Sequence, residues 1–167
     1  LEAPKDVVIA ALAEAKRRGA VTILNPAPAA ELPREVFPHV DVLTPNESEA
    51  AALAGFPVDG AEAVERAAAQ FLDWGVGAAV LTLGAAGCYL RTAEERLSVP
   101  AFPIPRVVDT TGAGDAFNGG LAAALAEGRP LAEAVRFGAA VGSLSVTRRG
   151  TAPAMPSRAE IDAMLGG

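Results

Sequence analysis

The chain has 167 residues, of which 51 % are hydrophobic and 20 % are charged. This length and composition are typical of a globular chain with a core of its own, and they exclude a disordered one. The formal net charge of −6 argues against non-specific binding to nucleic acid or to an anionic membrane surface. The single cysteine, Cys88, excludes an internal disulfide and a cysteine-based metal cluster.

Neither a membrane span nor a secretory signal is indicated. No apolar run reaches the roughly 20 residues that a transmembrane helix needs, and the opening LEAPKDVVIAA lacks a cleavage pattern. We therefore expect a cytoplasmic location. The first residue is Leu1 and not Met, which is compatible with a preceding segment. The single histidine, His39, follows a proline in a predicted loop, and we interpret it as an ordinary surface or packing residue.

Helical and extended patterns alternate along the first half of the chain. Short apolar runs predict buried strands at 21–24, 40–43 and 78–84, and apolar periodicity predicts helices at 5–18, 44–55 and 61–74. Gly19 and Gly75 stand where the first and the last of these helices should end.

The second half is predicted to be mainly helical. GCYLR at 87–91 and RLSVP at 96–100 are typical of a hairpin or an edge pair. Helices are expected at 112–127, 131–147 and 157–165, and Ser157 with Glu160 has the spacing of a capping box at the start of the last one. The whole order predicts an α/β layered fold with a mostly parallel sheet, in one domain.

Ligands of parallel sheets bind at the carboxyl ends of the strands. Four loops leave such ends, namely NPAPA at 25–29, TPNESE at 44–49, TLGAAG at 82–87 and DTTGAGD at 109–115. In the last loop, Gly112 and Gly114 allow a tight turn and a close approach of the backbone to a ligand. The helix that follows offers unpaired amides and a positive dipole end, which suit a phosphate.

Two familiar phosphate loops do not fit DTTGAGD. A Walker loop needs Gly-Lys-Ser/Thr, and a dinucleotide fingerprint needs a third glycine where Phe117 stands. An acid such as Asp115 beside a phosphate site is useful if it takes the proton from a hydroxyl that attacks the phosphoryl group. The pattern alone equally allows Asp115 to be no more than a favourable acid in the first turn of a helix.

The stretch DTTGAGDAF at 109–117 resembles the D-T-x-G-A-G-D-x-F signature of the ribokinase (PfkB-type) sugar kinase family. The other three loops and SVTRRGTAPAMP at 145–156 look like further blocks of the family in the family's order, so the resemblance covers essentially the whole chain. It implies transfer of a phosphoryl group from ATP to a sugar hydroxyl, with Mg²⁺ and K⁺ as the ions. NPAPA with TPNE points more narrowly to the conversion of D-ribose to D-ribose 5-phosphate.

Other functions stay open at this stage. Another family member would act on fructose, a keto-deoxy sugar acid or a nucleoside, and a truncated chain would only bind a nucleotide without catalysis. A dinucleotide-binding oxidoreductase domain belongs to a third class. Phe117 and the absence of an acid after an early glycine-rich turn argue against that class.

The resemblance also assigns roles to residues. Asp115 matches the base that deprotonates the sugar hydroxyl, and Gly112, Ala113 and Gly114 match the anion hole for the transferring phosphoryl group. Asn46 and Glu49 match an N-x-x-E motif that tunes Mg²⁺ and phosphate binding, although the same spacing fits a capping box. The nucleotide-binding positions are Asn46, Thr82, Leu83, Gly84, Ala85, Ala86, Gly87, Gly114 and Ala139.

Three further assignments come from the same resemblance. Glu2 matches an acid that hydrogen-bonds the sugar, which Asp115 also contacts. Ala139 stands where members often carry a polar side chain near the adenine, so nucleotide selectivity is expected to be relaxed. The positions around a monovalent cation, which act largely through backbone carbonyls, are Asp109, Thr111, Ser145, Arg148, Gly150 and Ala154. Arg148 and Arg149 equally fit solvated charges at a helix end.

The match begins in the middle of the family pattern. It implies a ribokinase-like layered fold whose N-terminal part, with the β lid and most sugar contacts, is missing. Residues 1–167 are then the C-terminal nucleotide-binding and catalytic part of a PfkB-type domain. We expect the full-length enzyme to be a homodimer that binds a sugar and ATP. The present chain alone is expected to be a poor kinase, because the hydroxyl must be held in line with the γ-phosphate.

Overall fold

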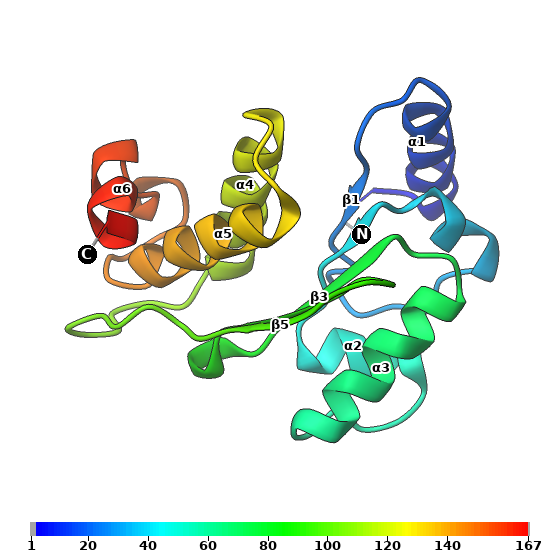
Figure 1. Cartoon of the computed structure of the whole chain (residues 1–167), viewed down its shortest axis with the longest axis horizontal. Helices are drawn as coiled ribbons and strands as arrows, with labels where there is room; N and C mark the ends of the chain where they lie inside the picture. Colours follow the sequence, from blue (N-terminus) through cyan, green and yellow to red (C-terminus); the bar gives the residue numbers. More distant parts are fainter. Residues whose placement is uncertain (1–2, 167) are drawn as a thin grey trace. The chain divides into compact units, whose positions relative to one another are not determined.

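The structure is a computed structural model that describes residues 3–166 (Figure 1). Its contacts divide the chain into two compact units. Unit 1 comprises the residues up to Leu83 together with Tyr89–Leu97, and unit 2 comprises Gly84–Cys88 and the residues from Ser98 onward. Among the helices of residues 3–166, none has the length and apolar character to cross a membrane.

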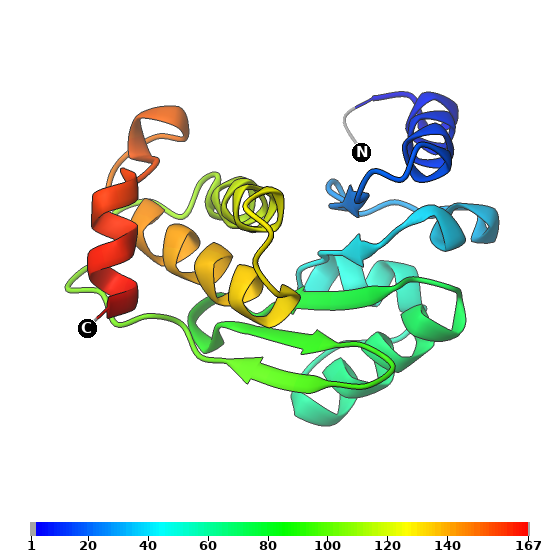
Figure 2. The same ribbon diagram turned by 45° about the horizontal axis from the view of Figure 1, so that its top comes forward.

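Five short strands form one sheet in the order β1-β2-β3-β4-β5. Their bounds are Ile23–Leu24 (β1), Val42–Leu43 (β2), Ala78–Thr82 (β3), Cys88–Arg91 (β4) and Arg96–Val99 (β5). β1 pairs with β2 and β2 with β3, both in parallel. β4 and β5 are drawn as oppositely directed arrows in Figure 2, which fits the predicted hairpin. The predicted α/β fold with a mostly parallel sheet is therefore confirmed.

Helices of unit 1 cover this sheet. They are α1 (Lys5–Arg17), α2 (Glu47–Ala54) and α3 (Ala61–Asp73), with a 3₁₀ helix, η1, over Arg34–His39. α3 buries Val64, Ala67, Ala68 and Phe71, the i, i+3, i+4, i+7 stripe of an amphipathic helix. Figure 2 shows α2 and α3 side by side on one side of the strands, and both contact β3. The helix ends agree with the sequence-based bounds to within a few residues.

Strands β1 and β2 are each two residues shorter than predicted. Asp41 is the reason, because its carboxylate accepts hydrogen bonds from the amide of Thr22 (2.9 Å) and the hydroxyl of Thr22 (3.0 Å) and also pairs with Lys16. The Thr22 amide therefore bonds a side chain, while the Thr22 carbonyl still accepts the amides of Asp41 (3.1 Å) and Val42 (3.0 Å). His39, expected in a loop, is the half-buried last residue of η1, and its carbonyl accepts a hydrogen bond from the Thr22 hydroxyl.

Unit 2 is built on two helices that approach each other closely. α4 spans Ala113–Ala126 and α5 spans Leu131–Ser145. A Cβ atom at Gly120 would lie 2.7 Å from Cγ2 of Val141, and one at Gly138 would lie 2.9 Å from the carbonyl oxygen of Phe117. Contacts this short leave no room for a methyl group, so the small residues of these helices set the distance between their axes.

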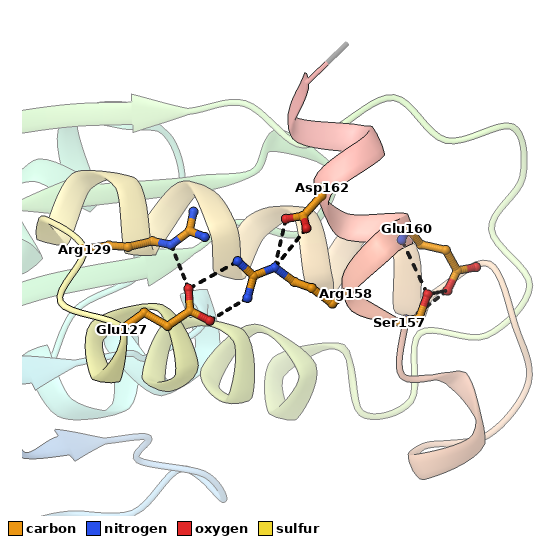
Figure 3. A network of polar contacts seen from close by, with 6 residues as sticks. All are labelled: Glu127, Arg129, Ser157, Arg158, Glu160 and Asp162. Carbon is orange, nitrogen blue, oxygen red and sulfur yellow. Dashed lines mark hydrogen bonds and ion pairs between the residues drawn. The ribbon is translucent and has the colours of Figure 1, made fainter.

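The last helix, α6 (Arg158–Gly166), is fixed by charged contacts that Figure 3 shows. Arg158 binds Asp162 one turn along (2.9 Å) and also pairs with Glu127 at the end of α4. The predicted capping box is present, since the Ser157 amide donates to the Glu160 carboxylate at 2.8 Å. This amide, followed by the Arg148 guanidinium, lowers the pKa of Glu160 to about 2.

Adjacent glycines of α4 give a matched test of the close helix packing. Gly120→Ala should destabilise unit 2 by about 1–3 kcal/mol, because the added methyl group meets Val141. Gly119 is exposed, and a Cβ atom there would have no neighbour within 4 Å. Gly119→Ala should therefore stabilise by about 0.5–1 kcal/mol through helix propensity. Thermal or denaturant unfolding measures both changes. Stabilisation by both substitutions would contradict the packing.

The low pKa of Glu160 predicts a pH dependence of stability. A carboxylate whose pKa is about 2 when folded and near 4.3 when unfolded stabilises the fold above the unfolded value, and this stabilisation is lost as the pH falls through about 2. Glu160→Gln should therefore lower Tm at pH 6 and match the wild type near pH 2. Melting curves from pH 2 to 6 test this, with the exposed Glu133→Gln as control. A Tm difference that stays constant over this range would refute it.

Candidate functional site

The N-terminus of α4 begins on a turn that only glycine fits. Gly112 has φ of 76°, the left-handed region, and its carbonyl accepts the amide of Ala116 at 2.9 Å. A Cβ atom at Gly112 would also lie 2.9 Å from Cγ2 of Thr151. Both the backbone conformation and the close approach of Thr151 therefore require glycine here. Thr151 has no local signal in the sequence, because its role depends on a contact between distant segments.

This turn leaves amides available for an anion. The Ala113 amide donates to the Thr110 carbonyl (3.2 Å), but no oxygen atom of residues 3–166 accepts a hydrogen bond from the amides of Gly114 or Asp115. Unpaired first-turn amides and the positive end of the helix dipole together attract a phosphate or carboxylate. Asp115 itself is exposed in the same first turn, so a carboxylate stands beside open donors.

The segment before the turn is held by the loop that follows α5. The Val108 amide donates to the Val146 carbonyl (2.7 Å), and the Asp109 carboxylate accepts the amides of Gly150 (3.0 Å) and Thr111 (2.9 Å). The Gly150 amide first and the Thr111 amide second lower the pKa of Asp109 to about 2. Asp109 is therefore ionised at neutral pH and joins two segments that are far apart in the sequence.

The predicted cation positions lie around this junction, all within unit 2. The backbone carbonyls of Asp109, Thr111 and Gly150 accept no hydrogen bond from the described residues. Free carbonyl oxygens of this kind are the donors that K⁺ prefers. The Ser145 hydroxyl donates to the Gly142 carbonyl, and the Arg148 side chain pairs with Glu160. Ala154 is buried in a 3₁₀ helix, η3 (Ala152–Ala154).

In unit 1, Asn46 and Glu49 form a complete capping box at the start of α2. The Asn46 side-chain oxygen accepts the Glu49 amide (2.9 Å), and the Glu49 carboxylate accepts the Asn46 amide (2.9 Å) and side-chain nitrogen (2.8 Å). Glu49 is only 7 % exposed, so both of its carboxylate oxygens face Asn46 and not solvent. This geometry fits an indirect effect on an ion better than direct ligation. Within residues 3–166, no group of three or more His, Cys, Asp or Glu side chains is arranged to hold a metal.

Carboxyl ends of three strands converge beside this cap. Thr82, the last residue of β3, forms a parallel bridge with Asn46, and its amide donates to the Pro45 carbonyl at 2.9 Å. The Asn25 side chain, after β1, donates to the Thr44 carbonyl at 2.8 Å. The structure thus brings together the loops that follow β1, β2 and β3, as a parallel sheet requires.

The remaining predicted positions are found in different settings. Leu83 is half-buried after β3, and Gly84, Ala85 and Ala86 form an exposed 3₁₀ turn, η2 (Gly84–Ala86). Gly87 has φ of 97°, and a Cβ atom there would lie 2.0 Å from the Val99 carbonyl oxygen, so this position requires glycine. Ala139 is 8 % exposed in α5. Glu2 lies outside the described residues.

Known proteins resemble this chain over nearly its whole length. Residues 1–158 match the pattern described as pfkB family carbohydrate kinase. A ribokinase of Haemophilus influenzae is 39 % identical over 160 residues, which cover 96 % of this chain and 52 % of that protein. The chain thus spans about half the length of that curated relative.

Solved structures agree with the sequence match. A ribokinase of Thermotoga maritima has a TM-score of 0.85 at 42 % identity, over 94 % of this chain and 52 % of that one. The Arabidopsis thaliana ribokinase complexed with ribose and ATP has a TM-score of 0.93 at 34 % identity, over 98 % of this chain and 53 % of that one. Together with the glycine turn and the acid at the start of α4, these matches establish that the chain belongs to the pfkB family of carbohydrate kinases.

Proposed function

We propose that the gene product containing this chain is an ATP-dependent sugar kinase that converts D-ribose to D-ribose 5-phosphate. The observation that carries the proposal is the exposed Asp115 carboxylate in the first turn of α4, beside the Gly114 and Asp115 amides that find no acceptor among residues 3–166. An acid and an anion site together are what phosphoryl transfer to a hydroxyl needs. Family membership and the similarity to ribokinases support the sugar substrate.

The proposed reaction uses both the anion hole at the start of α4 and the Asp115 carboxylate. The γ-phosphoryl group of ATP lies at the helix N-terminus, where Gly112, Ala113 and Gly114 form the anion hole. The sugar hydroxyl oxygen bonds to the γ-phosphorus as the bond to the β–γ bridging oxygen breaks, and ADP leaves. Asp115 takes the hydroxyl proton. The amides cost no reorganisation as charge develops, because the turn at Gly112 already fixes them.

Ions and the nucleotide complete the proposed site. Mg²⁺, when bound, neutralises charge on the phosphates, and the Asn46–Glu49 cap acts on it indirectly by fixing the loop after β2. K⁺ would be held by the carbonyls of the Asp109–Gly150 junction, which keeps the turn at Gly112 in place. The nucleotide would lie along Thr82–Gly87 and near Ala139, and Glu2 would contact the sugar. Homodimerisation and a cytoplasmic location stay predictions.

A sugar panel tests the substrate. The complete gene product is assayed for ADP release with ribose, 2-deoxyribose, fructose, a keto-deoxy sugar acid and a nucleoside. We expect kcat/KM to be highest for ribose. A higher kcat/KM for another sugar would support a sugar kinase with a different substrate. ADP release that no sugar stimulates would overturn the proposed function. Residues 1–167 alone should show little ribose-dependent turnover.

Removal of the proposed base is the first prediction for this site. Asp115→Asn should lower kcat by about 10²–10⁴ and leave ATP binding largely intact, because a positioned base contributes about this much. Asp6→Asn is a matched control, since Asp6 is also an exposed acid in the first turn of a helix, α1. If both variants kept wild-type turnover, Asp115 would be only a helix-stabilising acid.

Substitution of Glu49 distinguishes an effect on the Mg²⁺ dependence of the rate from an effect on helix capping. Glu49→Gln should raise the Mg²⁺ concentration needed for half-maximal rate, because the loop after β2 loses a charged anchor. Rate against Mg²⁺ concentration and Tm are measured together, with Glu160→Gln as control because it changes the other capping box. A stability loss of about 1 kcal/mol with an unchanged Mg²⁺ curve would leave capping as the whole role of Glu49.

A further inference from the structure

Asn118 contacts the backbone of the anion site from one turn further along α4. Its side-chain nitrogen donates a hydrogen bond to the carbonyl oxygen of Gly114 at 2.9 Å. That carbonyl belongs to the same peptide group as the amide of Asp115, one of the two amides that find no acceptor among residues 3–166. Asn118 therefore bonds one end of a peptide group whose other end is available to an anion.

The two ends of a peptide group are electronically coupled. Resonance makes the group planar, so the direction of its carbonyl fixes the direction of its N–H. A donor on the carbonyl oxygen also polarises the group, and chains of hydrogen bonds strengthen one another in this way. The Asn118 side chain thus adds to the helical backbone in holding the Gly114–Asp115 peptide plane, and it makes the Asp115 amide a stronger donor.

The sequence of α4 is locally unfavourable at this place. Asn118, Gly119 and Gly120 are consecutive poor helix formers in the interior of the helix. Contact with Val141 explains Gly120. Asn118 uses its side chain to bond the Gly114 carbonyl, which is the backbone of the anion site. Residues that violate local preference are expected where function requires them.

We propose that Asn118 is a positioning residue, which aims the Asp115 amide at the transferring phosphoryl group. This inference rests on the proposed function. It assigns Asn118 no contact with the substrate, since its effect passes through the Gly114–Asp115 peptide group. The role predicts a loss in kcat with little change in the KM for ATP, because the amide contact strengthens as charge develops in the transition state.

Three substitutions in the complete gene product test the donor. Asn118→Ala removes the donor and should lower kcat about 5–20-fold, less than the 10²–10³-fold loss of a whole oxyanion donor. Asn118→Ser keeps a hydroxyl that can donate to the carbonyl four residues back, so its kcat should stay within about 3-fold of wild type. Asn118→Asp is of similar size but cannot donate when ionised, and it should lose at least as much as Asn118→Ala.

Stability and a neighbouring substitution provide the controls. Tm of Asn118→Ala should not fall, because alanine is the better helix former. Gly119→Ala changes helix propensity at the adjacent exposed position and should leave kcat unchanged. Equal kcat for wild type and Asn118→Ala, or equal losses for the alanine and serine variants, would overturn the positioning role.

An NMR measurement separates this inference from the proposed function. The ¹⁵N–¹H resonance of the Asp115 amide is compared in wild type and Asn118→Ala without any ligand. We expect the Asp115 resonance to move more than those of Ala116 and Phe117 in Asn118→Ala and to stay close to wild type in Asn118→Ser. If no sugar stimulated the wild-type enzyme, the proposed function would fail while this shift still tested the peptide coupling. An unmoved Asp115 resonance would overturn the inference even in an active kinase.

Discussion

The hydrogen bonds that the Asp109 carboxylate accepts from the amides of Thr111 and Gly150 are the constraint on which the site depends. They close the segment before α4 onto the loop after α5, and the approach of Thr151 then leaves space only for glycine at position 112. The left-handed turn at Gly112 exposes the next amides instead of pairing them. The depressed pKa of Asp109 keeps this carboxylate ionised far below neutral pH.

Each of the two units holds its own set of candidate site residues. Unit 1 supplies strand ends, where the Asn25 side chain donates to the Thr44 carbonyl and Asn46 forms a backbone bridge with Thr82. Asn46 also caps α2 together with Glu49. Unit 2 supplies a helix N-terminus, an acid and a set of carbonyls that accept no bond from residues 3–166. The first part is held by sheet pairing and the second by glycine-mediated contact between α4 and α5. Each part is formed by interactions within its own unit.

Sequence reasoning was most successful where local chemistry decides the structure. The periodic apolar stripe of α3 and the stop at Gly75 were sufficient to place that helix. The spacing of Ser157 and Glu160 correctly predicted a capping box. The signature around Asp115 indicated the family by itself, because its glycines have a conformational role that the structure bears out at Gly112.

Contacts between residues that are far apart along the chain could not be predicted from the sequence. The Asp41 carboxylate accepts two hydrogen bonds from Thr22 just before β1 and β2 begin, and no local pattern indicates them. The Asp109–Gly150 bond joins residues that are 41 positions apart. Asn118 did carry a signal, since an asparagine before two glycines is unusual inside a helix, but only its bond to Gly114 gives that signal a meaning.

In the proposed reaction, the amides at the start of α4 bind the phosphate that is transferred. Amide NMR of the complete gene product, titrated with Mg²⁺ and a non-hydrolysable ATP analogue in the presence of ribose, tests it directly. We expect the Gly114 and Asp115 amides to show the largest downfield shifts, because they change from unpaired to anion-bound donors. Saturated nucleotide binding that leaves both resonances unmoved would contradict it.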